Sequence, residues 1–271
     1  MKRHWILYII FMSLCFSCCK SNSSVKEVFV KGAEFDFSEA LNTNSETVTI
    51  KNFYISKYKI TRREYEAFLK ETGYAEYTSD SMEYSFDVTM PEPECPAMFV
   101  SFYDACEYCN YLSEKNNLKK VYDLSDLSNI KRDKTANGFR LPSKNEWFYA
   151  LLGGTKYSKT IWWEKMSYTD YMDIDHSFTS HAPVGRLKPN PLKLYDILGN
   201  GLEWTDTEIY KESFNDNEKC AFVAGPGVPG YTISEFENCT EFLTDSYKTE
   251  PCGSMDTRYF YIGFRVARNA E

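Results

Sequence analysis

The most reactive side chains in this sequence are thiols. Three cysteines stand near the N-terminus, and the others are spread along the chain at Cys95, Cys106, Cys109, Cys220, Cys239 and Cys252. Thiols form disulfides outside the cytosol, and thiolates bind soft metal ions such as copper(I). Cys239 and Cys252 have twelve residues between them. That spacing permits a disulfide between the two, a disulfide from either one to Cys220, or a metal site if a loop brings them together.

Other catalytic residue types are scarce. Past the N-terminal segment the histidines are His176 and His181, with Asp173 and Asp175 nearby. Their spacing does not match the facial triad of an iron enzyme, and the sequence contains no nucleophile elbow, Walker loop or dinucleotide fingerprint. The chain has a net charge of −8, whereas nucleic-acid binding needs a basic surface. Nucleic acid is therefore not an expected partner.

The N-terminus has the pattern of an export signal. Lys2 and Arg3 precede an apolar run over 5–16, which is too short to span a bilayer. Cys18 follows, before a polar stretch suited to a tether. We expect a signal peptide over 1–17, a lipid anchor on Cys18, and a tether and N-terminal extension over 18–45. The protein would then be attached to a membrane through its lipid, in the periplasm or at the cell surface; an ordinary signal peptide is the alternative.

The sequence predicts where three helices begin. Thr61, Ser101 and Ser143 each precede a carboxylate by three residues, which is the capping-box spacing. Apolar residues follow at helical spacing, and Cys109 falls on the buried face of the second helix. Strands are expected over 48–55, 221–224 and 259–267, with irregular stretches over 74–99, 155–188 and 205–256. The outline is a single α+β domain over 46–271 with short helices, few strands and many long loops.

Several segments resemble the sulfatase-modifying factor family, which includes the formylglycine-generating enzymes. The matching blocks occur in order over about residues 50–268, starting with 54–68 and 100–112. Next come Gly138-Phe139-Arg140-Leu141-Pro142-Ser143 with Glu146-Trp147, then Gly199-Asn200 with Glu203-Trp204, and finally Ile262-Gly263-Phe264-Arg265. The resemblance implies a formylglycine-generating-enzyme-like fold, related to the C-type lectin fold.

The resemblance also implies a calcium site. Relatives hold calcium near the Gly-Asn turn through oxygen ligands, which a hard cation prefers. The corresponding candidates here are the side chains of Asn200 and Glu203 and the carbonyl of Leu202. The sequence departs from the family at three places nearby, where Gly201 and Leu202 replace Val-Trp and Lys193 replaces Gly.

The catalytic block differs more. Formylglycine-generating enzymes oxidise a substrate cysteine with a copper(I)-binding cysteine pair that follows an Arg-Gly-Gly-Ser block. The corresponding segment here, 223–227, lacks that Arg and Ser, and 228–234 contain no cysteine. Two hypotheses follow. The chain binds a protein or small ligand without this chemistry, or it converts cysteine to formylglycine through a rearranged copper site at Cys239 and Cys252.

The binding hypothesis has a candidate surface in 205–256. That stretch holds eleven Asp+Glu against three Lys, with interleaved aromatic residues at Tyr210, Phe214, Phe222, Tyr231, Phe236, Phe242 and Tyr247. Aromatic and polar residues together suit a recognition surface. The alternative is a solvated loop whose rings pack inward.

Overall fold

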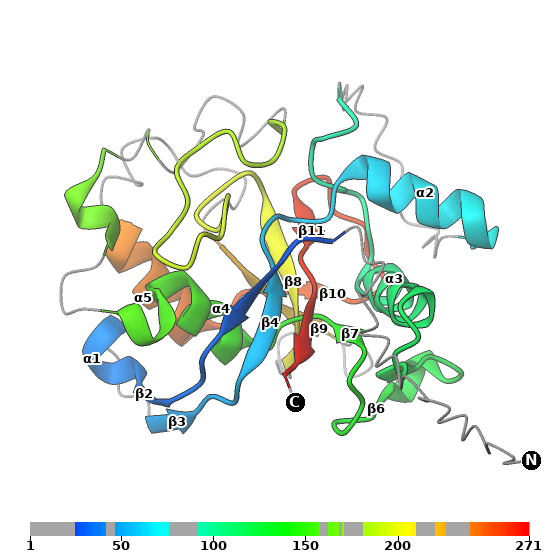
Figure 1. The fold of residues 1–271 in the computed structure, drawn as a ribbon, viewed down its shortest axis with the longest axis horizontal. Helices are drawn as coiled ribbons and strands as arrows, with labels where there is room; N and C mark the ends of the chain where they lie inside the picture. The colour runs from blue at the N-terminus through cyan, green and yellow to red at the C-terminus, as the bar shows by residue number, and fades with distance from the viewer. Residues whose placement is uncertain are drawn as a thin grey trace, which may run out of the picture.

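The computed structural model describes residues 25–41, 47–75, 92–157, 162–167, 170, 181–209, 220–225 and 239–270, with only the backbone at 165 and 239–242. Two four-stranded sheets lie at the centre, with helices on both sides (Figure 1). The helices are α1 (Phe37–Leu41), α2 (Arg62–Thr72), α3 (Phe102–Lys115), α4 (Lys144–Leu152) and α5 (Cys239–Thr249). Short 3-10 turns are η1 (Leu127–Asn129), η2 (Gly154–Lys156) and η3 (Trp162–Lys165). Helices α2 and α3 lie on one side of the sheets, and α1, α4 and α5 lie on the other.

The first sheet is antiparallel and has the order β1-β4-β12-β7. Its strands are β1 (Glu27–Val30), β4 (Phe53–Ser56), β12 (Ala267–Asn269) and β7 (Phe139–Arg140). The second sheet has the order β10-β9-β8-β11, with β11 parallel to β8. Its strands are β10 (Cys252–Ser254), β9 (Cys220–Ala224), β8 (Leu202–Ile209) and β11 (Ile262–Phe264). Two small antiparallel pairs complete the fold: β2 (Glu34–Asp36) with β3 (Thr47–Thr49), and β5 (Tyr122–Asp123) with β6 (Lys131–Arg132).

The three helix starts predicted from capping boxes are confirmed. Thr61, Ser101 and Ser143 each accept a hydrogen bond from the third helical residue, whose carboxylate bonds back to the backbone N–H of the cap. Helices α2 and α4 end at left-handed glycines, where no side chain opposes the turn. Short-range capping therefore sets where these helices begin and end.

The predicted domain start at residue 46 is too late. Residues 25–41 form β1, β2 and α1, and β1 pairs with β4 inside the first sheet. Phe37 and Leu41 of α1 are fully buried in the core. The folded unit therefore includes residues that the sequence placed in the N-terminal extension.

Two predicted strands are each divided between different sheets. The segment 48–55 contributes β3 to a small pair and β4 to the first sheet. The closing segment 259–267 contributes β11 to the second sheet and β12 to the first. The chain crosses between sheets at Arg265 and Val266, both fully buried. Apolar runs predict burial but do not show where a strand changes partner.

The stretch 205–256 is more regular than predicted. It contains most of β8, all of β9 and β10, and the helix α5. Leu243 and Tyr247, four residues apart in α5, are buried, and the Tyr247 ring stacks on Phe37 of α1. Threonines interrupt the apolar pattern of α5 and have low helix propensity, which hides the helix in the sequence.

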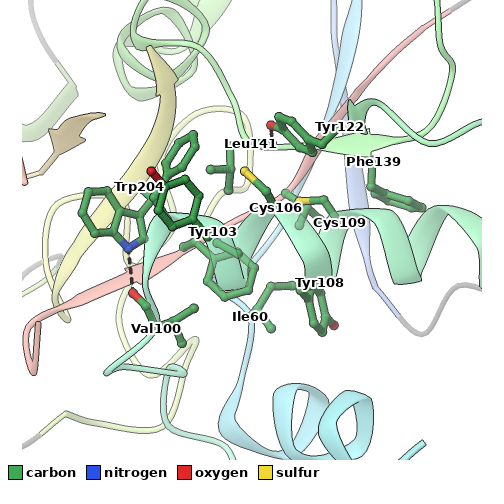
Figure 2. Packing of buried hydrophobic residues seen from close by; sticks show 14 of the residues in the cluster. Ile60, Val100, Tyr103, Cys106, Tyr108, Cys109, Tyr122, Phe139, Leu141 and Trp204 are labelled. Carbon is green, nitrogen blue, oxygen red and sulfur yellow. Dashed lines mark hydrogen bonds between the residues drawn. The ribbon is translucent and has the colours of Figure 1, made fainter. Parts of the chain in front are cut away.

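Cys106 and Cys109 belong to the core. Figure 2 shows both thiols on α3 among aromatic and aliphatic side chains from several elements. Burial raises the pKa of both thiols well above the ordinary value. The core position predicted for Cys109 is confirmed, and neither thiol is poised to react.

Within the described part of the chain, we find no helix with the length and apolarity needed to cross a bilayer.

Candidate functional site

Among the described residues, a fully buried charged site is centred on Glu203 of β8. Arg265, at the crossing between β11 and β12, donates from Nε to Oε2 at 2.6 Å and from Nη2 to Oε1 at 2.8 Å. Lys59, just after β4, donates to Oε1 at 2.5 Å, and Trp147 of α4 donates its indole N–H to Oε2 at 2.9 Å. All four side chains are essentially fully buried. Both carboxylate oxygens of Glu203 are therefore occupied by donors.

Electrostatics favour the ionised form of Glu203. Burial alone would raise its pKa, but the charges of Arg265 and Lys59 outweigh that effect and hold the pKa at about 2. Burial lowers the pKa of Lys59, and Arg265 adds to this, while Glu203 opposes it. Lys59 also donates to the backbone carbonyl of Asp196 at 2.7 Å. Two cations thus share the Glu203 carboxylate, and the charge of Asp196 also acts on Lys59.

The calcium candidates do not fit a bound cation in this arrangement. Asn200 forms two bonds to Ala182, accepting from its N–H at 3.0 Å and donating to its carbonyl at 2.8 Å. Leu202 lies in β8 opposite Ile262 of β11. The ammonium of Lys59 bonds to oxygens of both Glu203 and Asp196. A hard cation needs several free oxygens, whereas the side-chain oxygens of Asn200 and Glu203 already accept protein donors.

Several backbone positions in this region are in the left-handed conformation, and two of them stand where the sequence departs from the family. Lys193, which stands where the family has glycine, has φ +68°, so its backbone is in the left-handed region that glycine favours. Gly201 has φ +91°, and a Cβ there would lie 2.2 Å from Cε of Met98. The left-handed backbone favours glycine at this position, and a larger residue would also have to displace the methyl group of Met98.

The two candidate catalytic cysteines stand at opposite ends of a helix. Cys239 is the first residue of α5, and Cys252 starts β10, three residues after α5 ends. Eleven residues of helix span about 16 Å, more than twice the Cα separation of about 6 Å in a disulfide. Cys252 is a half-buried free thiol, and Cys220 is a buried free thiol. The helix thus occupies most of the segment between the two cysteines, and neither Cys252 nor Cys220 forms a disulfide.

Other predicted residues lie in or beside the undescribed parts of the chain. Cys18, His176 and the segment 226–238 lie outside the described residues. His181 is buried. Among the residues that are described, no group of three or more His, Cys, Asp or Glu side chains is placed to hold a metal ion.

The predicted recognition surface is only partly described. Phe222 and Tyr247 are buried, and they pack against Phe148 of α4. For these two rings the inward-packing alternative is confirmed. The remaining aromatic side chains of that surface lie outside the description: Tyr210, Phe214, Tyr231, Phe236 and Phe242.

A groove of about 630 Å³ opens between the 129–134 segment, β8 and the start of α4. On its floor, Arg132 bonds to Asp206 at 2.5 Å and to Glu208 at 2.7 Å. Arg140 makes a two-bond pair with Glu146 at 2.6 and 2.7 Å. Burial raises the pKa of Asp206, an effect that Arg132 opposes. Arg140 is matched by one carboxylate, whereas Arg132 is shared by two, so the groove is lined by more acidic than basic side chains.

The sequence motifs do not identify Lys59 as a site residue. A lysine between Tyr58 and Ile60 in an apolar stretch is the available signal, because a lysine so placed must find a buried anion. In the sequence, Arg265 stands out only as part of the closing strand.

Comparisons with known proteins agree with this fold. The family profile of the sulfatase-modifying factor enzyme 1-like domain matches residues 16–270. The chaperone protein LppX of Paenibacillus barcinonensis is 30% identical over 245 residues, covering 74% of this chain and 80% of that protein. The formylglycine-generating enzyme of Thermomonospora curvata is 23% identical over 258 residues, covering 82% and 83%.

Solved structures share the fold at lower identity. The crystal structure of CarF superposes with a TM-score of 0.67 at 21% identity, covering 91% of this chain and 99% of CarF. Treponema denticola variable protein 1 gives 0.61 at 20% identity, covering 91% and 95%.

Proposed function

The chain belongs to the family of sulfatase-modifying factor enzyme 1-like domains, and we propose that it is an exported, lipid-anchored member that binds another polypeptide at the membrane surface. The observation that carries the proposal is the separation of Cys239 and Cys252 by the length of α5. A copper(I) site made of two thiolates needs both sulfurs within a few ångströms. A scaffold retained without that pair suits binding better than oxidation.

The relatives give independent support. LppX, at 30% identity, carries the name chaperone protein, and chaperones act on other polypeptides. The formylglycine-generating enzymes in the comparison are more distant, at 23% for the Thermomonospora protein. The name of this relative supports a polypeptide as the partner of this chain.

A client-protection assay tests the binding function. The full chain, purified in detergent from membranes, is mixed with thermally unfolding citrate synthase, and light scattering follows aggregation. We expect suppression near a one-to-one ratio, with serum albumin in the same detergent as the control. Scattering equal to the albumin control would overturn the proposal.

Copper(I) titration of the reduced chain tests the oxidase alternative. We expect no tight stoichiometric binding. Stoichiometric binding that is lost in both Cys239→Ser and Cys252→Ser, but kept in Cys220→Ser, would replace the binding function with cysteine oxidation.

The lipid anchor has its own test. Cys18→Ser should move the protein from the membrane fraction and abolish labelling by a fatty-acid analogue, whereas Cys19→Ser should not. Unchanged partitioning of Cys18→Ser would remove the anchor from the proposal without affecting the client assay.

A further inference from the structure

The first sheet has an open edge at β1. Among the described residues, this strand pairs with β4 alone and forms one end of the order β1-β4-β12-β7. The N–H of Lys57 donates to the carbonyl of Lys26 at 2.7 Å, so Lys26 faces β4. Backbone groups of an antiparallel strand alternate between its two edges. Those of Val28 therefore also face β4, and those of Glu27 and Phe29 face outward, where no described residue bonds to them.

An exposed aromatic ring marks the middle of this edge. Phe29 is 49% exposed, and among the described residues no other large apolar side chain is exposed. Its ring packs edge-on against Tyr54 of β4 at 5.5 Å, and the guanidinium of Arg268 covers the Tyr54 ring at 4.1 Å. Proteins usually protect such edges, because unpaired backbone groups can accept a further strand.

We propose that the β1 edge accepts an extended segment of a client polypeptide as an added strand. An apolar client side chain would lie on Phe29, and main-chain bonds would form to Glu27 and Phe29. The proposal rests on the proposed binding function and assigns it a surface.

The charged side chains beside β1 indicate which client segments would bind. The exposed side chains of Lys26 and Lys31 flank the edge, one at each end. The Glu27 carboxylate is already held by Arg268, with Nε at 2.9 Å and Nη2 at 3.0 Å. The two lysines therefore favour a client segment with acidic residues on both sides of its apolar centre.

A second copy of this chain fits the edge less well. Self-pairing would offer the lysines only Glu27, whose oxygens already accept from Arg268. A four-residue strand also buries much less than the about 1,200 Å² that stable dimers need.

Peptide binding to the full chain in detergent tests the proposal. The probe is a fluorescent Asp-Thr-Val-Thr-Phe-Thr-Val-Asp peptide, and its control is N-methylated at alternate residues along one edge. We expect anisotropy to report binding of the probe and not of the control. Phe29→Pro, which removes one outward N–H, should weaken binding by about tenfold or more, whereas Phe29→Thr, which keeps it, should weaken binding less.

Charge reversal keeps the test decisive if Phe29→Pro fails to fold. The double variant Lys26→Glu with Lys31→Glu should lose the acidic peptide and gain a lysine-flanked version. Equal binding of control and probe, an unchanged charge preference, or dimerisation through β1 seen by sedimentation would overturn the assignment. If Phe29→Pro, still folded, protects citrate synthase as well as the parent does, the β1 edge is wrong while the binding function stands. If the parent gives no protection, the binding function itself fails.

Discussion

Arg265 and Glu203 form a two-bond ion pair with both side chains fully buried. The two residues come together because β11 runs parallel to β8 and places Gly263 opposite Glu203. Arg265 then leaves the second sheet for the first, so its guanidinium also donates to carbonyls of Ser56 and Tyr195. One arginine thus ties together both sheets and the loop before β8.

Removing the Glu203 charge should strongly destabilise the fold. In Glu203→Gln, Lys59 and Arg265 lose the anion that both contact, and breaking a buried pair costs about 3–5 kcal/mol. Urea unfolding followed by circular dichroism measures the loss. Glu208→Gln is the matched control, because Arg132 keeps Asp206 and the position is less buried. A similar loss in both variants would contradict the central role of Glu203.

Acid should weaken the fold through the same carboxylate. The folded pKa of Glu203 is about 2 against an ordinary 4.5, so its stabilisation is complete above pH 4.5 and is lost as the pH falls through 2. A depression of that size corresponds to about 3 kcal/mol. Unfolding free energies between pH 6 and pH 2 should therefore fall more steeply in the parent than in Glu203→Gln. Parallel pH profiles of the two proteins would refute the assignment.

Thiol labelling should separate the cysteines by burial. Cys252 is half-buried, whereas Cys106 and Cys109 are fully buried with raised pKa values. We expect native-state alkylation of Cys252 to be at least about tenfold faster than that of the two core thiols. Peptide mass spectrometry gives the rates, and guanidinium should equalise them. Recovery of a Cys239–Cys252 disulfide from the unreduced chain would show that α5 does not hold the two apart.

Gly201→Ala should destabilise the turn before β8. The substitution adds a Cβ 2.2 Å from the Met98 methyl carbon and keeps φ at +91°, which together cost about 1–3 kcal/mol. Thermal unfolding measures the change. Combining it with Met98→Ala should recover the part due to the clash and leave the backbone strain. Full additivity of the two losses would show that Met98 does not limit this position.

Local sequence determined a large part of the fold. The capping boxes at Thr61, Ser101 and Ser143 depend on residues three apart, so they could be located directly. The ordered blocks over 50–268 indicated the family for the same reason, because each block fills one turn, cap or strand.

Tertiary structure decided the rest. That β1 joins the first sheet, that the closing segment divides between two sheets, and that Lys59 meets Glu203 across 144 residues all depend on contacts distant in sequence. The arrangement of Cys239 and Cys252 also depended on structure that their spacing in the sequence does not show. The spacing of Cys239 and Cys252 allowed a bond or a metal site, and most of the segment between them forms the helix α5. Spacing sets only the longest separation that a segment can reach, whereas secondary structure within the segment sets its actual length.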